Sequence, residues 1–197
     1  MHSPGAARDR PGKGDETGML NPDAVLAARE ERWKRRLFLA GRGGQGTVLL
    51  SLTLRMPAFL RTSGKYHREA ELLFSAFAEE AARRGMKIVE KEYRGGADGP
   101  ECHLSLRENG EASKAFAVFF EETHPWGALV DADVMTPEGI PLSRRDLGIP
   151  ERRCLVCGGP AAPCAAGRTH SPGELEERIR GILAHPFHVP FPKEGAK

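Results

Sequence analysis

The sequence lacks any apolar run that is long enough to cross a membrane. Its longest apolar runs, residues 48–50 and 115–120, fall well below the roughly 20 residues that a transmembrane helix needs. The N-terminus mixes proline, glycine, arginine and aspartate without an apolar centre, so it is not typical of a secretory signal. We therefore expect a cytoplasmic protein without membrane association.

An excess of charge of one sign is missing as well. The 29 lysines and arginines are nearly matched by 27 aspartates and glutamates, which leaves a formal net charge of +2. Proteins that bind nucleic acids usually carry a basic stripe with aromatic side chains between the charges, and the sequence has no such stripe. A nucleic-acid partner is therefore not expected.

Cysteine is scarce, with four residues in the chain. In a reducing cytoplasm such a number is more typical of metal ligands or free thiols than of a disulfide framework. Three of the four recur in the pattern Cys154-x2-Cys157-x6-Cys164-x5-His170, which has the ligand types and close spacing of a structural zinc site. The alternative is a set of free thiols in a small core, because cysteine is among the most buried residues.

The length of 197 residues supports one domain with one substantial core. Residues 1–18 are rich in glycine, proline and charge, which predicts a disordered leader. We expect a catalytic core over residues 19–150, followed by a Cys/His segment with a packed C-terminal helix over residues 151–185. A poorly ordered tail is expected over residues 186–197.

Hydrophobic periodicity predicts alternating helices and strands. Helices are expected over residues 21–40, 66–84, 115–120 and from 171 onward, and strands over residues 47–54, 86–93, 102–106 and 129–135. A strand stays an alternative for residues 115–120, because apolar residues alternate there. Helices and strands alternate at first and short strands follow later, which favours an α+β fold with a mixed sheet and flanking helices.

The first helix and the glycines after it set the start of the core. Leu26, Trp33 and Leu37 recur on one helical face, and Asn21 is a suitable N-cap. The glycine-rich residues 41–46 follow this helix and precede a predicted strand. Phosphate-binding loops have the reverse order, so we interpret this segment as a connector.

Two acids lie on one face of the predicted strand at residues 129–135. Side chains two residues apart in a strand point the same way, so Asp131 and Asp133 would have Cα atoms roughly 6 to 7 Å apart. Carboxylates held this close in apolar surroundings need a proton or a cation between them. Mg²⁺ suits such a pair and would serve phosphoryl or nucleotidyl transfer. The alternative is a solvated strand face, which we expect for Glu90 and Glu92.

The residues around this pair resemble a known family. The segment His124-Pro125-Trp126-Gly127, followed by Asp131-Ala132-Asp133-Val134, resembles the signature H-P-L-G-R-L-x-D-x-D-V of apo-citrate lyase phosphoribosyl-dephospho-CoA transferases. The resemblance covers residues 20–185 and continues at 143–148, 150–157, 164 and 170–171, with weaker matches at 28–32, 51–54 and 99–101. Ala128 replaces the arginine of the signature, Ala166 is a second departure, and residues 57–61 lose a glycine of the family pattern.

The resemblance implies a nucleotidyltransferase-like fold and a transfer reaction. A serine of the citrate lyase acyl carrier (gamma) subunit would attack the α-phosphate of triphosphoribosyl-dephospho-CoA, and diphosphate would leave. Asp131 and Asp133 would hold Mg²⁺, and His124 would orient a phosphate or act as a base. The expected substrate-binding residues are Arg61, Lys114, Gly127, Arg144 and Arg145. The alternatives are surface charges for the basic residues and a structural turn for His124.

Two other functions compete with this one. A protein that has lost substrate binding through Ala128 and Ala166 would be a non-catalytic interaction module built on a zinc knuckle. A protein that keeps the chemistry but has changed its acceptor would be a nucleotidyltransferase with another target.

Overall fold

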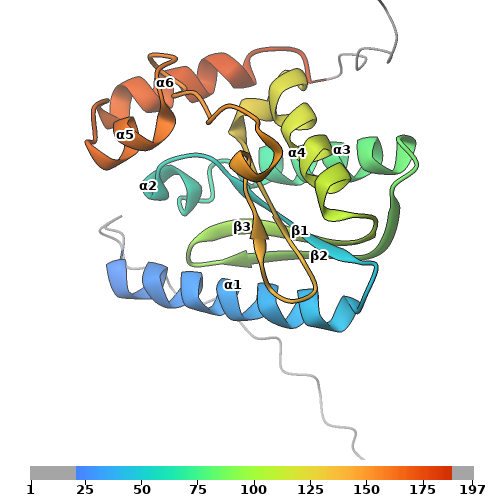
Figure 1. Ribbon diagram of the computed structural model, residues 1–197. Helices are drawn as coiled ribbons and strands as arrows, with labels where there is room; N and C mark the ends of the chain where they lie inside the picture. The colour runs from blue at the N-terminus through green and yellow to red at the C-terminus, as the bar shows by residue number, and fades with distance from the viewer. Residues whose placement is uncertain (1–20, 188–197) are drawn as a thin grey trace, which may run out of the picture.

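The structure, a computed structural model, describes residues 21–187 and is built on a five-stranded sheet (Figure 1). The strand order is β2-β3-β1-β4-β5, and every hydrogen-bonded pair is antiparallel. The strands are β1 (Val48–Leu54), β2 (Lys87–Gly96), β3 (Gly99–Arg107), β4 (Val130–Met135) and β5 (Pro141–Leu142). The predicted leader at residues 1–18 lies outside the described residues, as do residues 188–197 of the tail predicted over 186–197. Within the described part of that tail, Phe187 packs against the core.

The α+β class is confirmed, but the prediction of a mixed sheet is wrong. Helix α3 (His67–Arg83) connects β1 to β2, and helix α4 (Gly110–Thr123) connects β3 to β4. Each helix therefore joins two strands that run in the same direction. A third strand lies between the two in both cases, so the parallel strands never pair.

Helices α3 and α4 cover one face of the sheet and form the main core with it (Figure 1). The ring of Phe77 lies 4.9 Å from that of Phe116 and 4.7 Å from that of Phe120, between ring centroids. The prediction of a helix at residues 115–120 is confirmed. This helix begins five residues earlier, at Gly110, because the Asn109 side chain accepts a hydrogen bond from the Ala112 N–H.

Helix α1 (Pro22–Gly43) covers part of the opposite face (Figure 1). It begins at the predicted cap, where the Asn21 side chain accepts from the Asp23 N–H. Its apolar stripe is largely exposed, with Leu26 at 58% and Trp33 at 45% of their possible accessible area. The sheet face beneath is polar, and the helix turns its arginines toward that face.

The polar face is organised in rows that run across three strands. Two rows run from β4 through β1 to β3, Asp131-Thr53-Glu101 and Asp133-Ser51-His103. The Ser51 Oγ lies 2.9 Å from the His103 Nδ1, and both side chains are buried. Helix α1 places Arg32 against Asp98, at 2.5 Å, and Arg35 against Glu92. Ion pairs thus attach α1 to the sheet, together with Leu39 and Ala40, which pack with Leu49 and Met135.

The C-terminal part of the chain folds back over the ends of β1 and β4. It contains the short helix α5 (Ala161–Ala166) and the predicted helix α6 (Pro172–Leu183), which begins with a capping box formed by Ser171 and Glu174. Ile179 and Ile182 join the main core. The remaining elements are the short helices α2 (Ala58–Arg61), η1 (Gly127–Leu129) and η2 (Arg145–Leu147). None of the described helices is both long and apolar enough to span a membrane.

Candidate functional site

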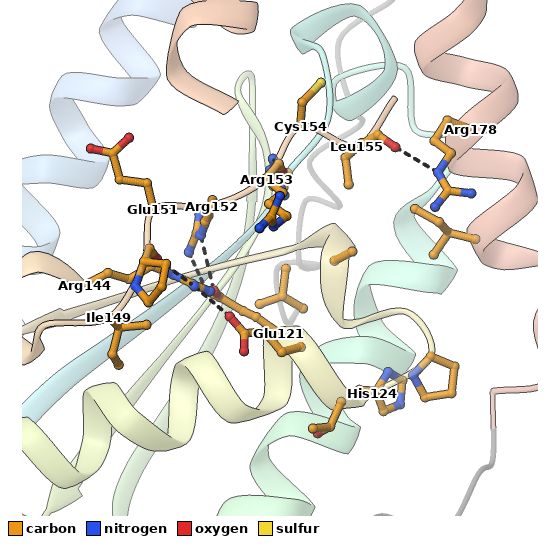
Figure 2. A pocket seen from close by; sticks show the side chains of 18 of the residues that line it. Glu121, His124, Arg144, Ile149, Glu151, Arg152, Arg153, Cys154, Leu155 and Arg178 are labelled. Atoms are coloured by element: carbon orange, nitrogen blue, oxygen red, sulfur yellow. Dashed lines mark hydrogen bonds and ion pairs between the residues drawn. The ribbon is translucent and has the colours of Figure 1, made fainter. Parts of the chain in front are cut away.

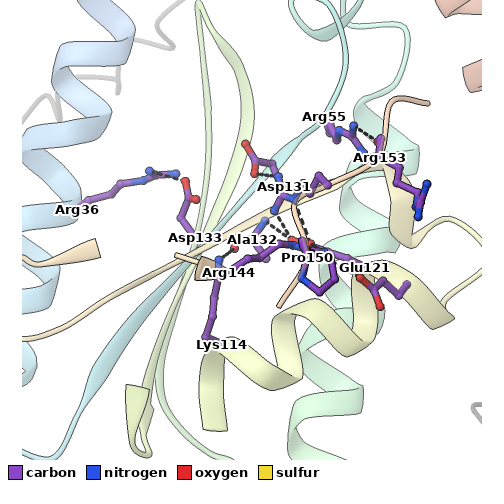
Figure 3. Close-up of polar contacts among 12 residues, drawn as sticks. Arg36, Arg55, Lys114, Glu121, Asp131, Ala132, Asp133, Arg144, Pro150 and Arg153 are labelled. Atoms are coloured by element: carbon purple, nitrogen blue, oxygen red, sulfur yellow. Dashed lines mark hydrogen bonds and ion pairs between the residues drawn. The ribbon is translucent and has the colours of Figure 1, made fainter. Parts of the chain in front are cut away.

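Asp131 and Asp133 lie on the same face of β4, as their spacing predicted. Their side chains are 38% and 47% exposed, and each one meets an arginine from another segment (Figure 3). The Arg36 Nη1 of α1 donates to Asp133 Oδ2 at 2.9 Å, and the Arg152 Nη1 donates to Asp131 Oδ1. Two guanidinium groups therefore offset the repulsion between these acids.

The charge state of Asp131 follows from this pairing. Burial on the sheet raises the pKa of its carboxyl group, but the charge and hydrogen bond of Arg152 outweigh burial and hold the pKa below its usual range. Asp131 is thus ionised at neutral pH. An ionised and partly exposed carboxylate can accept a cation or a hydrogen bond from a ligand.

Glu121 is a site residue that sequence reasoning missed. Its side chain lies near the C-terminal end of α4 and is 5% exposed. It accepts hydrogen bonds from Arg144 at 2.6 Å, from Arg152, and from the Ala132 N–H at 3.1 Å (Figure 3). Arg152 therefore bridges two acids, Glu121 and Asp131. The available signal was that Glu121 lies three residues before His124, where the segment that resembles the family signature begins.

Lys114 and Arg61, which we expected to bind phosphate, make contacts within the protein. The Lys114 Nζ is buried and donates to the Ala132 carbonyl at 3.0 Å, which holds β4 between its two aspartates. Burial lowers the pKa of this lysine. The Arg61 guanidinium donates to the Asp98 carboxylate and to the Met56 carbonyl, so it secures the β2–β3 turn.

Arg144 and Arg145 differ in position. Arg144 points toward α4, where it pairs with Glu121 and, at 2.8 Å, with Glu122. Arg145 is 89% exposed, and its nearest carboxylate is that of Glu151 at 3.8 Å. The structure brings Arg144 beside the Arg152 bridge and leaves Arg145 at the surface.

The turn at residues 124–127 is tightly packed. The His124 ring is buried, stacks on Phe120 with centroids 4.7 Å apart, and accepts the Trp126 N–H through Nδ1 at 3.1 Å. A Cβ atom on Gly127 would lie 2.2 Å from the Phe120 carbonyl oxygen, so this position requires glycine. The turn therefore fixes where β4 begins.

A cavity of about 730 Å³ opens beside these residues (Figure 2). The C-terminal part of α4 forms one wall, and the segment that carries Arg152 and Arg153 forms another. His124 and Ala128 line this cavity. A second pocket of about 900 Å³, which Asp131 lines, lies between α2 and the Cys/His segment. The two pockets adjoin, because Arg55, Cys154 and Leu155 line both.

The Cys/His cluster that the sequence predicted is assembled in the structure. One ligand atom from each of Cys154, Cys157, Cys164 and His170 lies within 4.8 Å of the others. The Sγ atoms of Cys157 and Cys164 are 3.6 Å apart, and the buried His170 Nε2 has no hydrogen-bond partner. These four side chains can hold a metal ion.

The protonation of the cluster agrees with this assignment. Burial raises the pKa of the Cys154 thiol, but hydrogen bonds from the backbone of Cys157 and Val156 lower it to about 6. A hydrogen bond with Cys157 raises the pKa of Cys164 to about 11. At neutral pH a thiolate is thus available in the cluster. Cys102, by contrast, lies in the core, where burial raises its pKa to about 11.

Comparison with known proteins gives one family. Residues 21–185 match the family described as apo-citrate lyase phosphoribosyl-dephospho-CoA transferase. The protein of that name from Escherichia coli strain SMS-3-5 is 36% identical over 159 residues, which cover 81% of this chain and 86% of the relative. Proteins of the same name from Shigella boydii serotype 18 and Escherichia coli O157:H7 strain EC4115 have the same identity and coverage. The chain therefore belongs to the apo-citrate lyase phosphoribosyl-dephospho-CoA transferase family.

Proposed function

We propose that the protein transfers the phosphoribosyl-dephospho-CoA group from its triphosphate precursor to a serine of the citrate lyase acyl carrier subunit. The serine oxygen forms a bond to the α-phosphorus and loses its proton to water, the bond between that phosphorus and the bridging oxygen of the diphosphate breaks, and diphosphate leaves. The single observation that carries this proposal is the ionised Asp131 beside the adjoining pockets, on a chain that belongs to the family.

The residues divide into groups with different tasks. Transfer of this kind depends mainly on positioning and on neutralising charge. Asp131 and Asp133 supply two partly exposed carboxylates on one strand face, a donor set that fits Mg²⁺. When bound, Mg²⁺ would neutralise charge on the phosphates. Arg152 and Arg36 hold the two carboxylates in place.

His124 is proposed to orient a phosphate. Its Nδ1 accepts the Trp126 N–H, so the neutral ring carries its proton on Nε2. A ring in this tautomer donates a hydrogen bond, and a donor suits an anionic oxygen better than it suits the removal of a proton. The stacking on Phe120 fixes the plane of the ring.

Intact-mass analysis of the acceptor tests the proposed function. We expect the apo acyl carrier subunit of citrate lyase to gain the mass of one phosphoribosyl-dephospho-CoA group when it is mixed with this protein and triphosphoribosyl-dephospho-CoA. The matched control is a carrier with its acceptor serine replaced by alanine, which should gain nothing. An unmodified wild-type carrier would contradict the proposal and favour an interaction module or another acceptor.

We also propose that the Cys/His cluster binds a structural Zn²⁺. Tetrahedral zinc with Zn–S bonds of about 2.3 Å places its sulfurs about 3.8 Å apart. The separation of 3.6 Å between Cys157 and Cys164 is close to that value. The buried His170 Nε2, which has no other partner, would then be the fourth ligand.

Metal content tests the zinc proposal. Protein that is purified without chelator is expected to carry close to one zinc per chain by mass spectrometry of the metal. Cys154→Ser and Cys157→Ser should lower both the zinc content and the melting temperature, because metal binding contributes directly to folding. Cys102→Ala is the control and should leave the zinc content unchanged. Wild-type protein that contains no zinc would contradict the proposal and favour free thiols at these positions.

A further inference from the structure

Three arginines at the 730 Å³ cavity have no acidic partner among the described residues. Arg55 follows β1, Arg153 lies in the segment before the Cys/His cluster, and Arg178 lies on α6. No carboxylate within residues 21–187 forms an ion pair with any of them. They differ in this from Arg36, Arg144 and Arg152, which all pair with acids.

The three side chains are held in place by backbone carbonyls of a single loop. Arg55 Nη2 donates to the Arg153 carbonyl at 2.6 Å, and Arg178 Nε donates to the Leu155 carbonyl at 2.8 Å (Figures 2 and 3). Arg153 Nη1 donates to the Gly158 carbonyl at 3.2 Å. These bonds position the guanidinium groups without neutralising their charge.

The surroundings of Arg55 show the result of this arrangement. Burial lowers the pKa of Arg55, and the positive charge of nearby Arg152 lowers it further, whereas the charges of Asp131 and Glu121 raise it. Arg55, Arg153 and Arg178, which form no ion pair with these acids, place positive charge at the cavity. An anion in the cavity would relieve it, because arginine binds phosphate oxygens with paired, charge-assisted hydrogen bonds.

We propose that Arg55, Arg153 and Arg178 bind the diphosphate part of the triphosphate substrate, the part that leaves in the reaction. The nature of the substrate rests on the proposed function; the anion site rests on the arginines. Arg152 connects the aspartate pair with this anion site. Its side chain donates to Asp131, and the next residue in the chain is Arg153. A volume of about 730 Å³ is in the usual range of ligand pockets.

Other arginines near these pockets have acidic partners. Arg61 and Arg144 are less suited to this task because their charges are offset by Asp98 and Glu121.

Binding of inorganic diphosphate to the full chain, measured by calorimetry at low salt, tests the site. Arg55→Gln, Arg153→Gln and Arg178→Gln are each expected to weaken binding about tenfold or more, because each removes charge-assisted hydrogen bonds. The matched control is Arg107→Gln. Arg107 is exposed at the end of β3 that is far from Arg55, so its replacement should not change the affinity for diphosphate.

The outcomes separate this proposal from the proposed function. Wild-type affinity in Arg153→Gln and Arg178→Gln, with thermal unfolding unchanged, would overturn the site even if carrier transfer is observed. Absence of diphosphate binding by the wild-type protein would overturn it as well. Diphosphate binding that depends on the three arginines, without transfer to the carrier, would support the anion site and count against citrate lyase as the acceptor.

Discussion

Asp131→Asn and Asp133→Asn are each expected to reduce the rate of transfer to the carrier about a hundredfold or more. A carboxylate that holds a charge-neutralising Mg²⁺ at the reacting phosphate would contribute several kcal/mol, and each 1.4 kcal/mol is about tenfold in rate. Asparagine keeps the size of the side chain and an oxygen that can accept from Arg152 or Arg36. The measurement is the time course of carrier mass, at a substrate concentration that saturates the wild-type protein.

The matched control for this pair is Glu90→Gln. Glu90 lies on β2, is ion-paired with Arg42 and lines neither pocket. The transfer rate of this variant should therefore equal that of the wild type. Urea unfolding of all three variants checks that they fold. Full activity in both aspartate variants would contradict their assignment to the site and favour the alternative of a solvated strand face.

Glu121→Gln is expected to lower the free energy of unfolding by about 3–5 kcal/mol, the usual cost of removing one partner from a buried ion pair. The Glu121 side chain is only 5% exposed and neutralises both Arg144 and Arg152. Glutamine keeps the shape and one acceptor oxygen but removes the charge. Urea unfolding, followed by circular dichroism, measures the change.

Glu122→Gln is the neighbouring control. Glu122 contacts Arg144 at 2.8 Å as well, but its side chain is 58% exposed. Exposed ion pairs contribute about 0–1 kcal/mol, so this variant should unfold almost like the wild type. Equal losses in the two variants would mean that burial does not set the strength of this network.

Local pattern sufficed for most of the elements. The helix starts at Asn21 and Ser171 follow from capping, which depends on a few neighbouring residues. The pairing of the strands did not follow, because insertion of β1 between β3 and β4 is a contact between distant segments. The sequence could not predict which face of α1 contacts the sheet for the same reason, because the polar sheet face that pairs with its arginines forms only on folding.

The site shows the same division. The spacing of Asp131 and Asp133, and that of the Cys/His cluster, was readable because each set lies within a short stretch of sequence. The bridge from Glu121 through Arg152 joins residues 31 positions apart. A single sequence gives no means to choose which of its many glutamates and arginines meet in this way.

The attachment of α1 has a consequence for how the N-terminal helix responds to ligands. Arg36 of α1 and any cation bound at Asp133 act on one carboxylate, so each weakens the hold of the other. This competition is reciprocal: whatever occupies Asp133 loosens the helix, and a loosened helix makes Asp133 more available. Ion pairs provide part of the remaining contact, beside the packing of Leu39 and Ala40 with Leu49 and Met135, so added salt should weaken the attachment of the helix. A cation at Asp133 would thereby be thermodynamically linked to helix α1 through a single side chain.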